Sequence, residues 1–244
     1  MRQKPLILAV ETSGRIGSVA IASGRKLLAA ADFSGRLRHS AEIFPAIIAM
    51  LKDFGRKPKD IEHVYISAGP GSFTGLRIAT TLAKTMHLAN KTKIVALDTL
   101  DVIAANAIDL TTDAPNYEKI AAILDAKRGQ FFIAVYQRNT SDATWNKILP
   151  DSLMTASQFL DKFVTAGQSI WLLGEGLVYH AESFRVDGVQ FVDKSRWPAK
   201  AEKVHLLGWK MAQAGQFADP LLLKPTYLRR PEAEEKWGQH KIKG

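Results

Sequence analysis

A glycine-rich loop at residues 68–78, AGPGSFTGLRI, is the clearest candidate for chemistry in this 244-residue chain. Backbone N–H groups at a helix start, helped by hydroxyl groups and an arginine, can hold an anion. Gly71, Ser72, Thr74 and Arg77 are therefore candidate contacts to an anion or a nucleotide. The alternative is a structural turn, in which Ser72 or Thr74 caps the helix that follows. The loop by itself favours neither interpretation.

Two known phosphate-binding motifs do not fit this loop. A Walker A loop needs a lysine directly after its last glycine, but Leu76 follows Gly75. The dinucleotide motif G-x-G-x-x-G needs a third glycine; Gly69 and Gly71 match its first two, and Thr74 stands in the third place. Both departures weaken the prediction of a nucleotide site.

Metal ligands and nucleophiles do not form a recognisable catalytic group. No two histidines lie within one helical turn, and Ile43 stands four residues after His39, where a helical metal site would need a second ligand. Cysteine is absent, which excludes disulfides and thiolate chemistry and fits a reducing compartment. Glu11, Asp98 and Asp125 fall at or near expected strand ends, where acids either hold magnesium or cap turns. We expect no catalytic residue and no metal site in this chain.

The first lobe, residues 1–110, is predicted to have the order β-β-β-α-β-α-β-α. Short apolar runs and Gly-containing turns predict an antiparallel meander, followed by parallel strands that alternate with helices. The expected strands are 6–12, 18–23, 27–33, 63–69 and 93–97, and the expected helices are about 40–54, 75–89 and 99–108.

A turn-rich break at 112–117 predicts a boundary, and residues 111–230 form the expected second lobe. This lobe begins with a hairpin and then alternates, as a weak echo of the first lobe. Its expected strands are 119–126, 129–137, about 144–149 and 169–174, and its expected helices are about 155–164, 177–185 and 201–215. Residues 231–244 are a charged tail that we expect to be mobile.

The helix expected over residues 40–54 has a wider apolar arc than one sheet requires. A helix that covers a sheet needs an apolar stripe of roughly 100°. Here apolar residues fall on several sides, at Ile43, Phe44, Ile47, Ile48 and Met50. The pattern predicts a second surface that this helix covers.

Composition allows two interpretations of the positive charge. Lys and Arg number 33 against 24 acids, for a net charge of +9. Such a balance serves solubility, or it attracts a polyanion such as nucleic acid. No apolar run approaches the roughly 20 residues that span a bilayer, and the start lacks the apolar stretch of a secretory signal. We expect a cytoplasmic protein without membrane contact.

Several segments together resemble the TsaB (YeaZ) family, over about residues 5–230. In the first lobe these are LILAVETS, RHSAEIFPAI and SAGPGSFTGLRIATTLAK; in the second they are ILDAKRGQFFIAVY, LLGEG and PTYLR. One departure is Glu11, which stands where many relatives have Asp. The longer side chain would shift any phosphate bridged by a metal, which lowers the expectation of ATP use.

The resemblance implies an α/β fold of the actin-like, Hsp70 and sugar-kinase ATPase class (ASKHA, ribonuclease H-like), with a mixed sheet and flanking helices in each lobe. It implies a role in forming N6-threonylcarbamoyladenosine in tRNA, at the adenosine that follows the anticodon. The family member is a non-catalytic scaffold or activating subunit. It pairs with the catalytic paralogue TsaD, and the ATPase TsaE joins them. Metal and ATP are then expected in the partner subunits, with no cofactor in this chain.

The expected interface with TsaD lies on the helices of the first lobe. Its candidate residues are His39, Ile43, Phe44, Ile47, Met50, Ala79 and Ala83. We also expect Ile47 to lie on the outward face of its helix, and the same surface to allow a homodimer in isolation.

Other functions stay open at this point. The chain could be an ATP-dependent phosphotransferase of the same fold, with Glu11 and Asp125 around magnesium. Direct tRNA contact through the positive surface could coexist with scaffolding. A proteolytic role has no supporting group of residues.

Overall fold

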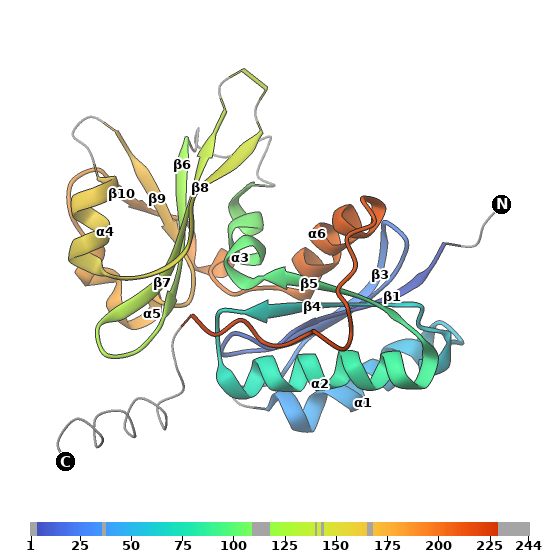
Figure 1. The fold of residues 1–244 in the computed structure, drawn as a ribbon. Helices are drawn as coiled ribbons and strands as arrows, with labels where there is room; N and C mark the ends of the chain where they lie inside the picture. Colours follow the sequence, from blue (N-terminus) through green and yellow to red (C-terminus); the bar gives the residue numbers. More distant parts are fainter. Residues whose placement is uncertain are drawn as a thin grey trace, which may run out of the picture.

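Two five-stranded mixed sheets lie side by side, each with its own flanking helices (Figure 1). The computed structural model describes residues 4–35, 38–108, 118–139, 141–142, 144–164 and 168–228. The predicted boundary segment 112–117 and the predicted tail 231–244 lie outside these residues.

The first sheet has the strand order β3-β2-β1-β4-β5. β1, β2 and β3 are antiparallel neighbours, and β4 and β5 run parallel to β1. Helices α1 and α2 cover one face, and α3 and α6 cover the other (Figure 1). The elements are β1 (Leu6–Glu11), β2 (Ser18–Ser23), β3 (Lys26–Asp32), α1 (His39–Asp53), β4 (His63–Gly69), α2 (Phe73–Asn90), β5 (Lys93–Asp98), α3 (Thr99–Ile108) and α6 (Ala201–Gln213). The predicted order β-β-β-α-β-α-β-α is confirmed.

The second sheet repeats this topology. Its order is β10-β9-β6-β7-β8, in which β6, β7 and β8 are antiparallel neighbours and β9 and β10 continue in parallel from β6. The elements are β6 (Lys119–Asp125), β7 (Gln130–Arg138), β8 (Trp145–Thr155), α4 (Ala156–Phe163), β9 (Ile170–Leu173), α5 (Leu177–His180) and β10 (Val189–Phe191). The predicted echo between the lobes is therefore a shared strand order.

Three details of the second lobe differ from expectation. β8 continues to Thr155, beyond the predicted end near residue 149. The helix predicted over 177–185 is one α-helical turn followed by a 3-10 segment, Ala181–Phe184. The short strand β10 was not predicted, because three residues carry too little of a pattern to be recognised.

The predicted second lobe is wrong for its last part, because α6 and the segment after it pack on the first sheet. His205 Nε2 donates to the Gly24 carbonyl oxygen at 2.8 Å. Further along, the backbone N–H of Thr226 donates to the Ala68 carbonyl oxygen at 2.7 Å. Close approach is possible because Gly208 has no side chain; a Cβ there would lie 2.6 Å from the Tyr65 ring.

One hydrophobic core joins the two lobes. It runs from the face of the first sheet that meets α3 and α6 into the second sheet, and it includes Tyr65, Leu100, Ile103, Ile123 and Ile133. A separate core fills the space between the first sheet and helices α1 and α2. Among the described residues, no helix combines the length and the apolar character needed to cross a membrane.

Candidate functional site

Glu11 ends β1 inside the protein, with no exposed surface. Its Oε1 accepts hydrogen bonds from the Ser13 backbone N–H at 2.6 Å and from Ser13 Oγ at 2.5 Å, and its Oε2 accepts one from Ser67 Oγ. Burial raises the pKa of Glu11, and these hydrogen bonds act in the opposite direction. Both carboxylate oxygens of Glu11 are thus occupied by hydrogen bonds from this chain's own serines.

The glycine loop packs directly on the turn that follows β1. Thr12 Oγ1 donates to the Gly75 carbonyl oxygen at 2.7 Å, and the Ser72 N–H donates to the Ser13 carbonyl oxygen at 2.8 Å. A Cβ on Gly75 would lie 1.7 Å from the Thr12 carbonyl oxygen, and one on Gly71 would lie 2.7 Å from Ser13. The missing side chains therefore make room for the protein's own backbone.

The other candidate anion contacts have local partners. Ser72 is the N-cap of α2, and its Oγ accepts from the Gly75 N–H at 3.3 Å, which confirms the capping prediction. The Arg77 guanidinium lies 3.8 Å from the centre of the Phe73 ring, and its Nε is 3.4 Å from the Tyr227 hydroxyl. Thr74 is exposed in the first turn of α2. Three of the four predicted contacts, Gly71, Ser72 and Arg77, are thus engaged by neighbouring groups of the protein.

A contact between the lobes closes the turn after β1 from its other side. The Arg15 backbone N–H donates to Glu175 Oε2 at 2.7 Å, and a Cβ on Gly14 would lie 2.8 Å from the same oxygen. The Arg15 guanidinium also donates to the Tyr179 hydroxyl at 2.5 Å and lies 4.5 Å from the centre of that ring. The carboxylate of Glu175 thus takes a backbone donor that a bound anion at this turn would use.

Gly174 and Gly176 allow this approach from the second lobe. Gly174 has φ +121°, and a Cβ there would lie 2.2 Å from the Ile123 carbonyl oxygen. A Cβ on Gly176 would lie 2.8 Å from the Leu124 carbonyl carbon. Sequence reasoning used this LLGEG segment only as a family signature and missed the contact between the lobes.

Asp125, the other acid considered for magnesium, belongs to its own hairpin turn. Its carboxylate accepts from the Lys127 N–H at 2.7 Å and from Lys127 Nζ at 2.8 Å. Partial burial opposes ionisation, but the hydrogen bonds and the charge of Lys127 keep the pKa of Asp125 lowered. With Glu11 buried and Glu175 on the turn, the residues described here do not fit a nucleotide phosphate and its metal.

Three carboxylates converge between the lobes, around Lys147. The ligand oxygens of Asp98, Asp101 and Asp151 lie within 4.8 Å of one another. Lys147 Nζ lies 3.4, 2.7 and 2.5 Å from them, respectively. The Tyr136 hydroxyl donates to Asp101 at 2.5 Å. The ammonium group therefore occupies the place a metal ion would need, and the cluster is an ion-pair network.

Burial and the neighbouring charges act against each other on the pKa values of this network. Burial raises the pKa of Asp151 to about 6, against the attraction of Lys147 and with the repulsion of the other two acids. Burial alone would lower the pKa of Lys147, but the hydrogen bonds and charges of Asp101 and Asp151 together raise it. Sequence reasoning missed this network, because β8 brings Lys147 to Asp98 and Asp101, which lie far away in the chain.

Helix α1 divides its apolar residues between two sides. Ile43, Ile47 and Met50 are buried against the first sheet, whereas Phe44 and Ile48 are 56% and 57% exposed. The prediction that Ile47 faces outward is wrong, because its side chain is 5% exposed.

The remaining interface candidates are also buried. His39 packs on Phe33, with ring centres 5.8 Å apart, and burial lowers its pKa. Ala79 and Ala83 lie in the core beneath α2. Of the seven candidates, Phe44 alone could contact a partner without repacking.

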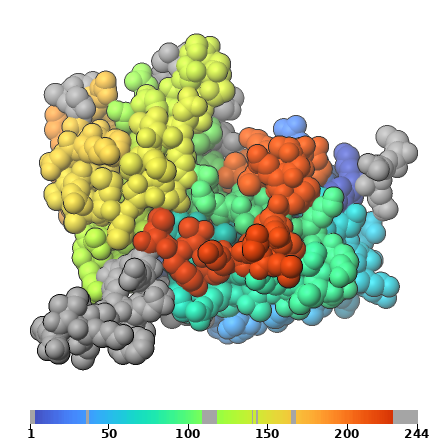
Figure 2. All heavy atoms as spheres, in the orientation of Figure 1, coloured from blue at the N-terminus to red at the C-terminus, as the bar shows by residue number. Residues whose placement is uncertain are grey.

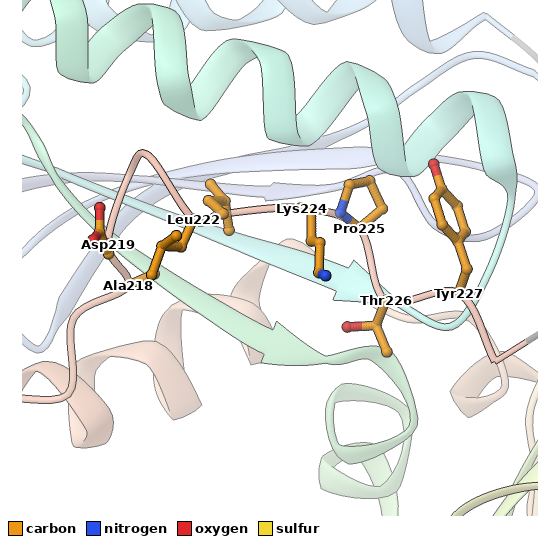
Figure 3. A pocket seen from close by; sticks show the side chains of 8 residues that line it. Ala218, Asp219, Leu222, Lys224, Pro225, Thr226 and Tyr227 are labelled. Atoms are coloured by element: carbon orange, nitrogen blue, oxygen red, sulfur yellow. The ribbon is translucent and has the colours of Figure 1, made fainter.

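A surface hollow of about 540 Å³ follows the C-terminal segment 218–227 beside α2 (Figure 3). This segment lies on the outside of the molecule, where it passes from the first lobe toward the second (Figure 2). Among the eight residues that line the hollow, Asp219 and Lys224 supply the charges. A ligand site needs several convergent polar groups, and we assign no ligand to this hollow.

Two sheets that share one unusual strand order and meet through a common core define the actin-like ASKHA class of fold. A family model described as "TsaD: tRNA N6-adenosine threonylcarbamoyltransferase" matches residues 35–188. TsaB from Bacillus subtilis is 28% identical over 95% of this chain and 97% of its own length. TsaB from Buchnera aphidicola subsp. Schizaphis graminum is 30% identical over 70% of this chain and 79% of its own length. The chain belongs to the TsaB (YeaZ) family, and it has a role in tRNA threonylcarbamoyladenosine biosynthesis.

Solved structures agree on the fold. The solved structure described as YeaZ from Pseudomonas aeruginosa superposes with a TM-score of 0.74 at 20% identity, over 92% of this chain and 100% of that one. A second structure from the same organism, described as similar to peptidase YEAZ, gives a TM-score of 0.75 at 20% identity, with the same coverage.

Proposed function

We propose that this chain is a non-catalytic scaffold subunit that activates a TsaD-type paralogue in tRNA threonylcarbamoyladenosine synthesis. The observation that carries the proposal is the outward apolar stripe of α1. Ala41, Phe44, Pro45, Ile48 and Ala49 are all exposed on this helix. Large exposed apolar side chains in one row are typical of protein interfaces.

Helix α2 extends this surface with small residues. α1 and α2 lie side by side on the same face of the first sheet (Figure 1). Thr81 and Thr85 are exposed along α2, and Leu88 is exposed near its end. Small side chains allow a partner helix to approach closely, with the large apolar groups of α1 as anchors.

The interior of the site supports the absence of catalysis in this chain. Glu11 is buried and hydrogen-bonded, Glu175 covers the turn after β1, and position 43 holds a buried isoleucine where a helical metal pair would need a ligand. Both carboxylates therefore already have hydrogen-bond partners inside the protein. The chemistry, with its metal and ATP, then belongs to TsaD-type and TsaE-type partner subunits.

A single substitution on α1 tests the pairing. Ile48→Glu places a charge in the middle of the stripe, and we expect at least a hundredfold weaker association with the TsaD-type paralogue in isothermal calorimetry. Ile148→Glu is the matched control, because Ile148 is similarly exposed, at 47%, but lies on β8 of the second lobe. Equal affinity of the two variants would reject the α1 interface. A homodimer that forms through the same stripe should dissociate in the Ile48 variant only.

The alternative, an ATP-dependent phosphotransferase, has a separate test. Calorimetry of the isolated chain with Mg-ATP should give no binding heat at micromolar to millimolar concentrations. Micromolar binding with turnover would favour the enzyme.

A further inference from the structure

Four segments of the first lobe converge at one end of its sheet. β1 pairs with β4 at Ile7 and His63, and β4 pairs with β5 at His63 and Lys93. The turn between β2 and β3 joins the same row, since the Gly24 N–H donates to the Pro5 carbonyl oxygen at 2.9 Å. The start of β1, the β2–β3 turn, the segment after α1 and the start of β5 are therefore neighbours.

The ends of helices α1 and α2 lie at this same end. Asn90, the last residue of α2, donates from Nδ2 to the carbonyl oxygen of Pro58, which follows α1, at 3.1 Å. In Figure 1 this end is the right-hand side of the first lobe, away from the second sheet. It is opposite to the end that carries Glu11 and the glycine loop.

Exposed cations collect on this end, which we call the basic edge. Segments 4–7, 23–26, 52–62 and 91–94 together contain nine cations and three carboxylates. Their net charge is +6, compared with +9 for the whole chain. The cations, all exposed, are Lys4, Arg25, Lys26, Lys52, Arg56, Lys57, Lys59, Lys91 and Lys93. The edge thus holds a large part of the chain's positive charge.

The basic edge is not neutralised within the described part of the chain. No ion pair joins any of its nine cations to a described carboxylate. Two of its three acids serve the backbone instead: Asp60 accepts from the Lys57 N–H at 2.9 Å, and Glu62 accepts from the Leu6 N–H at 3.3 Å. The cations are available to an external anion.

Helix dipoles explain only part of this charge. Cations near helix C-termini are favourable, and the effect falls off within the last turn. Lys52 and Lys91 lie at the ends of α1 and α2 and fit this explanation. Arg56, Lys57 and Lys59 lie on the connecting segment beyond α1, and Arg25 lies in a β-turn. These positions point to a partner with several negative charges.

We propose that the basic edge contacts the phosphate backbone of the tRNA substrate. Five strands at about 4.8 Å spacing make an edge about 19 Å wide, which is wide enough for several phosphates of one RNA strand. The family role in tRNA modification makes RNA the polyanion that this protein meets. The edge lies at the ends of α1 and α2, and its residues are separate from those of the α1 stripe. The inference rests on that family role and does not require the α1 pairing.

Salt-dependent tRNA binding by the isolated full-length chain tests the inference. Fluorescence anisotropy with labelled, unmodified tRNA measures the affinity between about 50 and 300 mM salt. Over this range, affinity that depends on phosphate contacts falls steeply as salt rises. The edge variant is Lys57→Gln with Lys59→Gln. The control is Lys162→Gln with Lys194→Gln, which removes the same charge from exposed sites of the second lobe.

We expect the edge variant to bind at least fivefold more weakly at low salt, with a slope of log affinity against log salt that is reduced by about 1.5. The control should change affinity less than twofold. Equal losses in both variants, an unchanged edge variant, or no salt-dependent binding by the wild type would overturn the proposal. The proposal would also be overturned if the edge variant lost binding to phosphatidylserine vesicles while its tRNA binding stayed unchanged. That result would assign the edge to a membrane surface.

Discussion

Replacement of Gly75 by alanine tests whether the glycine loop is a packing joint. A Cβ at this position would lie 1.7 Å from the Thr12 carbonyl oxygen and 2.8 Å from its carbon. These atoms belong to backbone that is fixed between β1 and the contact with Glu175, so they cannot rotate away. The start of α2 must therefore move off the turn.

The magnitude follows from the contacts that this movement breaks. The hydrogen bonds from Thr12 Oγ1 to Gly75 and from Ser72 to Ser13 contribute about 1 kcal/mol each. Overpacking against fixed backbone costs about 1–3 kcal/mol. The higher helix propensity of alanine offsets this loss by about 1 kcal/mol. The free energy of unfolding should fall by about 2–4 kcal/mol.

Urea unfolding followed by circular dichroism measures this change. Gly35→Ala is the control, because a Cβ at residue 35 would meet only the flexible Arg38 side chain, at 3.7 Å; its stability should stay within about 0.5 kcal/mol of the wild type. A Gly75→Ala protein as stable as the wild type would refute the reasoning. A phosphate cradle predicts instead that Mg-ATP stabilises the wild type, and we expect no such effect.

Two further predictions concern protonation. Lys147→Met should lower stability by about 2 kcal/mol at pH 8 and by less at pH 5, allowing for partial exposure. Burial raises the pKa of the Asp151 carboxyl to about 6, so its stabilising contribution is present below about pH 4 and is lost as pH rises through 6. At pH 8 the ionised carboxylate therefore depends on Lys147, whereas at pH 5 the carboxyl is largely protonated and depends on Lys147 less. Thermal melts at both pH values measure the difference, and an equal loss of stability at both would contradict the prediction. Burial lowers the pKa of the His205 ring in the folded protein. The neutral ring therefore contributes to the free energy of unfolding above pH 6.5, and this contribution is lost as pH falls through the folded pKa. His205→Gln retains a donor toward Gly24 and should therefore lose less stability than the wild type between pH 7 and pH 5; parallel curves would argue against the assigned neutral ring.

Local patterns predicted most of the elements. The apolar runs of the strands and the 3.6-residue period of α1 and α2 depend on each segment's own burial, so they are visible in one sequence. The same reasoning found the two-sided character of α1. It failed for Ile47, because a wide arc does not show which of its residues face the sheet.

Contacts between distant segments were not predictable in the same way. The apolar period of α6 does not show which sheet the helix packs on, and the close approach at Gly208 becomes visible only in the structure. Glu175 and Lys147 reach partners more than 40 residues away along the chain. The positive charge was visible in the composition, but its concentration on one edge depends on the strand register.

Reconstituted tRNA modification tests the central claim most directly. Threonylcarbamoyladenosine is measured with the TsaD-type and TsaE-type partners, tRNA and threonylcarbamoyl-adenylate, with and without this chain. We predict no product from the chain alone, product when the wild type or Ile148→Glu joins the partners, and at least tenfold less product with Ile48→Glu. Product from the chain without its paralogue, or full activity with Ile48→Glu, would contradict the account.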